Sequence, residues 1–599
     1  MKNQIIRLAC IIVLALLSDS ISAATDYISN IYGRDIQVLN GRWSAIIDQY
    51  DRGMKKKIYE DRHPKGKNDF YEYDFEGGLR LNVPGDWNSQ RTELKYYEGT
   101  VWYGRHFNVK KESGKRYFLY FAGVSYRCTV FLNGQAIASH EGAFTPFQAE
   151  VTDVLRQGDN MLVVQVNNRR EPDAIPAMSF DWWNYGGITR DVMLVTLPQT
   201  YISYYQVQLD KHRPDLVHAK VCLSDNRPGE TVSIHIPEIG KVVSAKTNGD
   251  GEATCDFRVK RLERWSPDSP RLYQVSIRST SDSVSEQIGF RNIEVAGTNV
   301  LLNGEATFLR SVSFHEEIPQ RMGRAFSEGD AQYLLSEVKA LGANMVRLAH
   351  YQQNEYVVRL AERMGIIVWQ EVPVWQSIDF SNMATLDKAR KMLTETIMRD
   401  VNRCADCFWG IANETRDTPE RNRFLKELLL TGKSADSTRL YTAAFNTAYY
   451  SKEKNAFALD DELIPYLDVI SINRYMGWYS PWPVAPEECR WEVVPDKPLF
   501  ISEFGGEAVY GQSGDETVAS SWSEDHQAKL YRDNIRMFRN IPNLCGVSPW
   551  VLFDFRTPLR MHPRHQEGWN RKGLLSDQGQ KKKAWYIMHD YYKEKTHNN

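Results

Sequence analysis

From about residue 297 the sequence alternates between short apolar runs and longer amphipathic stretches, and this alternation constrains the fold more than any other feature. The stretches Glu328–Leu341, Glu355–Met364 and Leu386–Arg403 have the periodicity of helices. The apolar runs have the length of buried strands: Phe308–Phe314, Asn344–Ala349, Ile366–Glu371, Phe408–Asn413, Leu440–Phe445, Asp468–Asn473, Leu499–Glu503 and Gly546–Phe553. Eight strands joined by helical crossovers predict a (β/α)8 TIM barrel. An open doubly wound sheet is the alternative, but no glycine-rich fingerprint follows the first strand.

The residues before the barrel have the sequence pattern of antiparallel β structure, with short apolar runs separated by turn residues. Between about 27 and 200, Cys128–Leu132 and Gln135–Ser139 flank Asn133-Gly134, the turn pair typical of a tight hairpin. Together with further short strands this predicts a β-sandwich of jelly-roll type. Between 201 and 296 the alternating runs Val217–Leu223 and Val232–Ile236 predict an immunoglobulin-like β-sandwich. We therefore expect a jelly-roll sugar-binding domain at 25–200, an immunoglobulin-like domain at 201–296 and a catalytic barrel at 297–599.

The first 24 residues have the pattern of a secretory signal peptide. Lys2 and Arg7 precede the apolar run Leu8–Leu17, which is shorter than the roughly 20 residues that span a bilayer. Ser22-Ala23-Ala24 supplies small residues for cleavage. A buried N-terminal helix is the alternative. The pattern predicts a secreted or periplasmic protein, and no later segment has the apolar length of a membrane span.

Charge and aromatic content indicate the class of ligand. The chain has 74 basic and 76 acidic residues and a formal net charge of −2, so nucleic acid or an anionic membrane is not expected as the main partner. The 16 Trp and 31 Tyr favour a carbohydrate, because aromatic faces stack on sugar rings. Oligomeric state is left open, a homo-oligomer included.

The sequence predicts neither a metal site nor an organic cofactor. It contains no His-Glu-x-x-His motif, no EF-hand loop and no phosphate-binding glycine loop. Cys404-Ala-Asp-Cys407 is a single Cys-x-x-Cys without a second pair at zinc spacing. We expect these two residues to be buried thiols, with a redox or metal role as the alternative.

Two glutamates close predicted barrel strands. Asn413-Glu414 ends the fourth strand and Glu503 ends the seventh. Because catalytic side chains project from the C-terminal ends of barrel strands, the two carboxylates are expected to face each other across the barrel mouth. Glycoside hydrolysis uses such a pair, one protonated to assist departure and one ionised to attack carbon. A retaining enzyme places the two carboxyl groups about 5–5.5 Å apart.

These motifs resemble glycoside hydrolase family 2, and within it most closely the β-glucuronidases. Trp409-Gly-Ile-Ala-Asn413-Glu414 is similar to the family's acid/base signature, and Ile501-Ser-Glu503-Phe-Gly is similar to its nucleophile motif. The resemblance extends over nearly the whole chain after the signal, and the family has these three domains in the same order. It implies that Glu414 is the acid/base and Glu503 the nucleophile of a glycosidase.

The resemblance implies further site residues, one position at a time. His315 would contact a sugar hydroxyl, Arg347 and His350 would orient the catalytic carboxylates, and Tyr475 would hydrogen-bond the nucleophile. A jelly-roll loop, Asp181–Ile188, would reach into the barrel mouth and bring Asp181 to sugar hydroxyls. Trp550, at the close of the eighth strand, would form the platform for the sugar ring.

Asn570-Arg571-Lys572 is the motif that distinguishes the β-glucuronidases from the galactosidases and mannosidases of the family. In the β-glucuronidases that it resembles, an Asn-x-Lys motif binds the substrate carboxylate, and an ammonium with an amide supplies suitable donors. The neighbouring stretch Phe555–Arg564 is rich in basic residues, which predicts an aglycone contact or a second carboxylate contact.

The sequence therefore predicts an exo-acting, retaining β-glucuronidase whose substrate is a carbohydrate with a terminal uronic acid. The alternatives are a β-galactosidase, β-galacturonidase or β-mannosidase of the same family, and a non-catalytic carbohydrate-binding protein. The aglycone and the linkage are left open.

Overall fold

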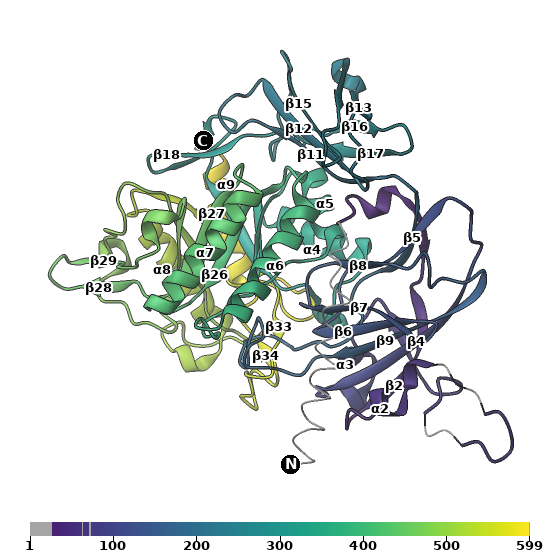
Figure 1. Ribbon diagram of the computed structural model, residues 1–599. Coiled ribbons are helices and arrows are strands. Elements are labelled where there is room, and N and C mark those ends of the chain that lie inside the picture. The colour runs from purple at the N-terminus through teal and green to yellow at the C-terminus, as the bar shows by residue number, and fades with distance from the viewer. Residues whose placement is uncertain (1–26, 61, 63, 71–72, 598–599) are drawn as a thin grey trace.

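The computed structural model describes residues 27–60, 62, 64–70 and 73–597. The segment expected to be a signal peptide lies outside the described residues. Within them the chain forms two β-sandwiches and one closed barrel, in that order along the sequence. In Figure 1 the second sandwich lies at one end of the barrel, and the first sandwich lies beside the barrel.

The first sandwich is a jelly roll of two antiparallel sheets. One sheet has the order β3-β2-β4-β9-β6-β7 and the other has the order β1-β10-β5-β8. Their inner faces pack Trp43, Tyr103, Leu119 and Val164 into one core. The strands are β1 Asp35–Val38, β2 Gly41–Asp48, β3 Leu79–Val83, β4 Thr100–Val109, β5 Lys115–Phe121, β6 Arg127–Leu132, β7 Gln135–Glu141, β8 Phe147–Glu150, β9 Gly158–Asn167 and β10 Val192–Pro198.

The hairpin expected around Asn133-Gly134 is confirmed. Strands β6 and β7 pair antiparallel, and Leu132 lies opposite Gln135. Asn133 and Gly134 both have positive φ, 52° and 82°, as the tight hairpin turn requires.

The second sandwich has the small two-sheet form of an immunoglobulin-like domain. Its sheets have the orders β11-β12-β15 and β14-β13-β16-β17. Alternate residues of β12 are buried, because only one face of that sheet meets the core. The strands are β11 Ile202–Leu209, β12 Leu216–Leu223, β13 Thr231–Ile236, β14 Lys241–Lys246, β15 Glu252–Arg258, β16 Tyr273–Arg278 and β17 Ser283–Ile288.

The third unit is the expected barrel, and the open sheet is excluded. Eight parallel strands close in the order β21-β24-β25-β26-β27-β30-β31-β32. They are β21 Leu309–Phe314, β24 Met345–Leu348, β25 Ile367–Glu371, β26 Asp406–Asn413, β27 Leu440–Phe445, β30 Val469–Asn473, β31 Leu499–Glu503 and β32 Leu544–Val547. The helices of this unit are α4 Glu328–Ala340, α5 Glu355–Met364, α6 Met383–Asp400, α7 Pro419–Ala435, α8 Glu524–Phe538 and α9 Lys583–His597.

The predicted extent of the eighth strand is wrong. The run expected as Gly546–Phe553 leaves the barrel after Val547. Pro549 lacks the N–H that a further pairing would use, and the chain then crosses the barrel mouth, where Trp550 N–H donates to the Phe504 carbonyl. Trp550 therefore lies on the segment beyond the strand and does not close it.

Shorter helices and strands complete the three units and the link between the second sandwich and the barrel. They are α2 Gly53–Lys56, α3 Trp87–Gln90, β18 Ile293–Ala296, β19 Asn299–Leu302, β20 Glu305–Ala306, β22 Glu317–Ile318, β23 Gly323–Arg324, β28 Tyr449–Ser451, β29 Ala456–Ala458, β33 Phe555–Arg556 and β34 Trp569–Asn570. In Figure 1, β33 and β34 lie at the end of the barrel away from the immunoglobulin-like sheets.

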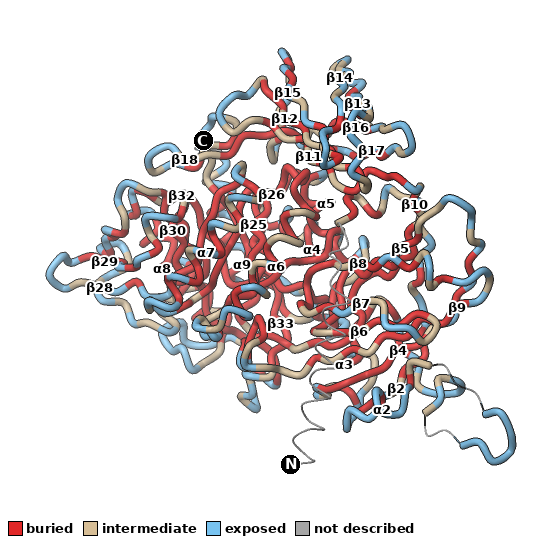
Figure 2. The backbone as a smooth tube through the Cα atoms, viewed as in Figure 1, coloured by how far each residue is buried: buried red, intermediate tan, exposed pale blue. Residues whose placement is uncertain are grey.

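Each sandwich contacts a different end of the barrel. Asn402, just before β26, accepts from Val207 N–H of the immunoglobulin-like domain at 2.9 Å. At the other end, Arg190 of the jelly roll pairs with Glu316, which follows β21, at 3.0 Å. Figure 2 shows buried backbone in both the barrel and the jelly roll, and one hydrophobic cluster contains Phe144 and Trp182 of the jelly roll together with Trp550 of the barrel. The jelly roll is therefore the unit positioned to add residues to the C-terminal mouth of the barrel.

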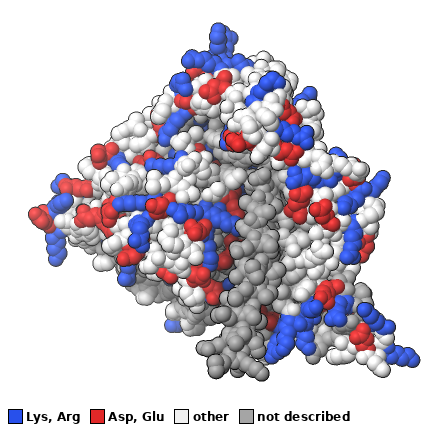
Figure 3. Space-filling model, in the orientation of Figure 1, with Lys and Arg blue, Asp and Glu red and all other residues white. Residues whose placement is uncertain are grey.

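The outer surface carries both signs of charge. In the described part of the face drawn in Figure 3, acidic and basic side chains are interspersed over all three units. Among the residues that the structure describes, no helix has the length and apolar character needed to cross a membrane.

Candidate active site

Five polar side chains converge at the C-terminal mouth of the barrel, each from the end of a different strand. They are Arg347 of β24, Glu371 of β25, Asn413 of β26, Asn473 of β30 and Glu503 of β31. All five are at least nine-tenths buried. Because the strands are parallel, these ends meet at one rim, as a TIM-barrel active site requires.

Glu503 is held through both of its carboxylate oxygens. Arg347 Nη1 donates to Oε1 at 2.7 Å, and Tyr475 OH donates to Oε2 at 2.7 Å. His350 Nε2 lies 3.8 Å from the same Oε1. The carboxylate is therefore fixed in position next to a permanent cation.

Glu414 directly follows β26 and adopts a positive φ of 55°. Its oxygens accept from two amides, Asn473 Nδ2 at 3.0 Å and Gln376 Nε2 at 3.1 Å. Burial and the nearby charge of Glu503 raise the pKa of Glu414, and the two amide donors oppose part of this effect. The surroundings of Glu414 therefore favour its protonated form.

A second carboxylate supports the arginine. Glu371 accepts from Arg347 Nε and Nη2 at 3.0 Å each, and His350 Nδ1 lies 2.8 Å from Glu371. Burial alone would raise the pKa of Glu371, but Arg347 and His350 outweigh it and lower the pKa. Arg347 is therefore clamped in a bidentate pair and presents its remaining nitrogen to Glu503.

Aromatic and imidazole rings line the space beside these carboxylates. Trp550 stacks on His350 with ring centroids 4.6 Å apart, and its ring is 5.5 Å from that of His315. Trp182, from the jelly-roll loop, lies 5.8 Å from His315. The loop expected to reach the barrel mouth does reach it.

Two buried donor or acceptor atoms in this space have no hydrogen-bond partner among the residues that the structure describes. They are Nε2 of His315 and Nδ2 of Asn413. Burial, and then the neighbouring charges of His350, Arg324 and Arg347, lower the pKa of His315 well below its ordinary value, so its ring is neutral. Unpaired buried polar atoms are rare in proteins, and here they are available to hydroxyl groups of a ligand.

Asp181 lies on the loop side of the same mouth and is held by residues of the β33–β34 connection. Thr557 Oγ1 donates to it at 2.8 Å, and Arg560 Nε donates at 3.1 Å. Asn570 Nδ2 is 3.4 Å away. The structure thus joins Asp181 to the predicted Asn-x-Lys motif.

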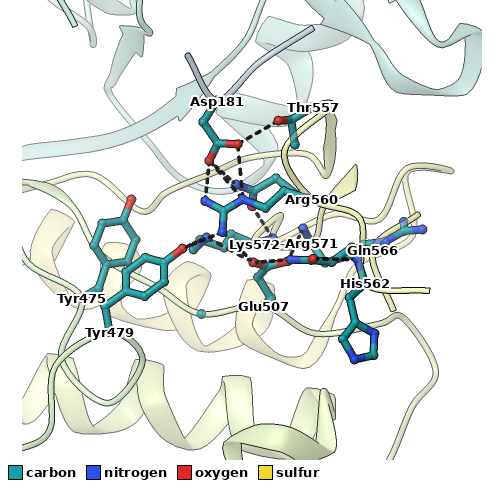
Figure 4. Close-up of polar contacts among 12 residues, drawn as sticks. Asp181, Tyr475, Tyr479, Glu507, Thr557, Arg560, His562, Gln566, Arg571 and Lys572 are labelled. Atoms are coloured by element: carbon teal, nitrogen blue, oxygen red, sulfur yellow. Dashed lines mark hydrogen bonds and ion pairs between the residues drawn. The ribbon is translucent and has the colours of Figure 1, made fainter. Parts of the chain in front are cut away.

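Lys572 is fully buried among polar partners (Figure 4). Its Nζ donates to Tyr479 OH at 2.8 Å and lies 3.4 Å from Glu507 Oε1. The Tyr479 ring lies 5.2 Å from the ring of Tyr475, which bonds Glu503. Two tyrosines, Tyr479 and Tyr475, thus connect the Lys572 ammonium to the predicted nucleophile.

Sequence reasoning missed five residues of this arrangement: Glu371, Gln376, Asn473, Tyr479 and Glu507. Glu371 and Asn473 end barrel strands as Glu503 does, so the same search for polar strand ends would have found them. Gln376, Tyr479 and Glu507 lie on loops, where hydrophobic periodicity gives no signal.

The Cys-x-x-Cys pair lies away from this mouth. Cys404 and Cys407 are free and buried, at the start of β26. Burial is the main cause that raises the pKa of both thiols. The expectation of buried thiols is confirmed.

Comparison with known proteins agrees with this architecture. Residues 36–198 match the model described as glycosyl hydrolases family 2, sugar binding domain; residues 200–291 match glycosyl hydrolases family 2; and residues 293–594 match its TIM barrel domain.

Individual proteins are similar over most of the chain. A putative β-glucuronidase of Formosa agariphila is 27% identical over 86% of this chain, which spans 66% of that relative's length. A β-glucuronidase structure from an uncultured Clostridium species has a TM-score of 0.82 and 26% identity, covering 95% of this chain and 99% of that one. A family 2 β-galacturonidase of Eisenbergiella tayi bound to galacturonate has a TM-score of 0.78 and 26% identity, with coverage of 94% and 98%.

Since the barrel match alone covers half of the sequence and the two other matches precede it in the family's order, the chain belongs to glycoside hydrolase family 2 and is a glycoside hydrolase.

Proposed function

We propose that this enzyme is a retaining, exo-acting β-glucuronidase that removes terminal β-linked glucuronic acid from glycans or glycoconjugates. The observation that carries the proposal is the buried Lys572 ammonium, bonded to Tyr479 and adjoining Asn570 at the catalytic mouth. A neutral sugar offers a buried ammonium only hydroxyl oxygens, whereas the carboxylate of a uronic acid offers a charged acceptor and a stronger, charge-assisted bond. The similarity to proteins named β-glucuronidase supports the same substrate class.

Glu503 is the proposed nucleophile. The positively charged Arg347 donates to its Oε1 and Tyr475 donates to its Oε2, so the carboxylate is oriented for attack on the anomeric carbon. The attack forms a C–O bond to the enzyme and breaks the glycosidic C–O bond. His315 and Asn413 are proposed to contact sugar hydroxyls, with Trp550 as the platform beneath the ring.

Glu414 is the proposed acid and then base. Its raised pKa lets it give a proton to the leaving oxygen. Glycosylation removes the negative charge of Glu503, which is one of the two causes that raise the pKa of Glu414. The pKa of Glu414 then falls, and the ionised carboxylate can take a proton from the water that hydrolyses the intermediate.

Lys572 and Asn570 are the proposed contacts to the uronate carboxylate, and Asp181 beside them is the proposed contact to sugar hydroxyls. Arg560, from the basic stretch singled out in the sequence, bonds Asp181 and lies 3.7 Å from Glu507. This position supports a second carboxylate contact rather than an aglycone contact. We also propose that residues 1–24 direct the enzyme to secretion or to the periplasm.

The second candidate is a β-galacturonidase, because a solved structure of that name, bound to galacturonate, has the same fold over nearly the whole chain. Both substrates carry the carboxylate that Lys572 would bind. They differ at the sugar hydroxyl groups, so paired aryl β-glucuronide and β-galacturonide assays separate the two.

Substitution of Lys572 tests the uronate assignment. A charge-assisted hydrogen bond contributes about 1.5–3 kcal/mol, so Lys572→Ala should lower kcat/KM on an aryl β-glucuronide by about tenfold or more. Activity on the matching β-glucoside should stay unchanged or improve, because a neutral sugar does not use the charge. The ratio of the two rates is decisive, since general damage to the fold lowers both. A wild-type preference for neutral galactosides or mannosides contradicts the proposal.

A further inference from the structure

Glu507 is a buried carboxylate that neither catalytic role explains. It follows Glu503 by four residues, on the loop after β31, and its side chain is 1% exposed. Gln566 Nε2 donates to both of its oxygens, at 3.1 Å and 2.9 Å, and Arg571 N–H donates to Oε2 at 3.1 Å. Figure 4 shows it between Lys572 and Gln566.

The two oxygens of Glu507 face different surroundings. Oε2 is held by the Arg571 backbone and by Gln566, which fixes the group in the loop. Oε1 is the oxygen that faces cations, at 3.4 Å from Lys572 Nζ and 3.7 Å from Arg560 Nη1. Burial would raise the pKa of Glu507, but Lys572, Gln566 and the Arg571 N–H together lower it. The group is therefore ionised and fixed while it faces the ammonium.

The cations of this cluster already have carboxylate partners. Lys572 has Glu507, and Arg560 has Asp181. The 3.4 Å separation of Lys572 from Glu507 is longer than the 2.7–2.9 Å of a full charge-assisted bond. An ammonium has three donors, and Tyr479 takes one of them at 2.8 Å. Lys572 thus has a phenol as a close partner and a carboxylate as a more distant one.

We propose that Glu507 is a resident competitor for Lys572, which weakens the hold on a uronate and thereby assists release of the uronic acid product. The inference rests on the proposed function. A uronate entering the site has to share Lys572 with a carboxylate already present. When the product leaves, Lys572 still has Glu507 as a partner. Release of the product therefore does not leave a buried ammonium unpaired, which would be strongly unfavourable. Glu507 acts through Lys572 and is a positioning residue.

The test measures binding of free D-glucuronate by calorimetry and by product inhibition. Glu507→Gln keeps the shape and an acceptor for Arg571 N–H but removes the charge. We expect the Ki of D-glucuronate to fall about tenfold, the size of one charge-assisted bond, and KM for an aryl β-glucuronide to fall with it. Binding of D-glucose, which has no carboxylate, should not change. Glu507→Asp keeps the charge but moves it away from Lys572 by one methylene. It should also lower the Ki of D-glucuronate, by less than Glu507→Gln does.

Controls separate this role from a structural one. Glu516→Gln removes a partly exposed carboxylate that pairs with Arg532 and should leave the Ki unchanged. If Glu507 only braces the loop, both Glu507 variants bind D-glucuronate more weakly or equally, and the competitor role is overturned. If the wild type binds neither D-glucuronate nor D-galacturonate, the proposed function itself fails. If the wild type binds D-glucuronate and neither Glu507 variant binds it more tightly, this inference fails and the proposed function stands.

Discussion

At the scale of single residues, the two glutamates differ in what surrounds them. Glu503 bonds a cation and a phenol, whereas Glu414 bonds two amides. Glu503→Ala should abolish turnover on every substrate, because no glycosyl-enzyme can form. Glu414→Ala should lower turnover of substrates with poor leaving groups by about 10²–10⁴-fold while sparing glycosylation by good ones, and azide should restore deglycosylation. Stopped-flow assays with a series of aryl glycosides measure this, and the reverse pattern would exchange the two roles.

Gln376 contacts Glu414, the proposed acid/base group. Its amide donates to Glu414 at 3.1 Å and lowers the pKa of that carboxyl. Gln376→Ala removes this effect, so the pKa of Glu414 rises and Glu414 stays protonated to higher pH. The alkaline limb of the kcat/KM profile should therefore move to higher pH. Gln332→Ala, on the exposed face of α4, is the matched control and should leave the profile in place. A shift of the alkaline limb to lower pH would contradict this role of Gln376.

Which site residues the sequence predicts depends on where they lie. Glu414 and Glu503 come from the ends of apolar strands, so the prediction of a barrel is enough to bring them together at one rim, whereas Arg347 is implied only by the family resemblance. Glu507 and Arg560 come from loops whose paths depend on tertiary packing. Their pairing with Lys572 and Asp181 joins segments far apart in sequence, and no local pattern encodes such contacts.

At the scale of elements, hydrophobic periodicity predicts the strands well and their ends less well. The predicted strands Leu440–Phe445 and Leu499–Glu503 match β27 and β31 residue for residue. The predicted end of the eighth strand is wrong, because the residues after Val547 are as apolar as those of a strand but lie across the barrel mouth. Burial alone does not distinguish a strand from a buried crossing segment.

Among the loops, we expect the connection between β33 and β34 to affect substrate binding most, because its conformation has to be held fixed beside the site. Asp181 tethers it through Thr557 and Arg560, across the junction between the jelly roll and the barrel. Asp181→Asn should loosen this loop, raise KM and expose the chain to trypsin after Arg560 and Arg564. Limited proteolysis with mass spectrometry identifies the cuts. Asp387→Asn, which breaks a surface pair with Arg390, should leave the digestion pattern unaltered, and equal protection of both variants would rule out the tether.

At the scale of the whole molecule, the jelly roll and the barrel are joined through buried polar groups. The β22–β23 hairpin docks on the jelly roll, where Arg324 N–H donates to Asp86 at 3.0 Å. Arg190 reaches from the jelly roll to Glu316 at 3.0 Å, with both side chains at most 2% exposed. These contacts fix the loop that carries Asp181 and Trp182 relative to the barrel strands. Catalytic geometry therefore depends on the packing of two domains.

Glu317, in the same hairpin, makes this junction sensitive to pH. Burial raises its pKa from 4.5 to about 8, and the Arg556 N–H at 3.1 Å opposes only part of that effect. A carboxyl group whose pKa is higher in the folded state binds more protons folded than unfolded. Its contribution to stability is thus complete below pH 4.5 and is lost as the pH rises through about 8. Within that window the loss is about 1.4 kcal/mol per pH unit.

Glu317→Gln should remove this dependence, because the amide does not titrate. Calorimetric Tm values measured from about pH 5 to about pH 8 should fall less steeply for the variant than for the wild type. Glu305→Gln, at an exposed position on β20, should reproduce the wild-type slope. The comparison uses slopes rather than absolute Tm values, since a chain of three domains need not unfold in one step. Parallel slopes for Glu317→Gln and the wild type would mean that Glu317 is ionised in the folded protein and that the junction tolerates its charge.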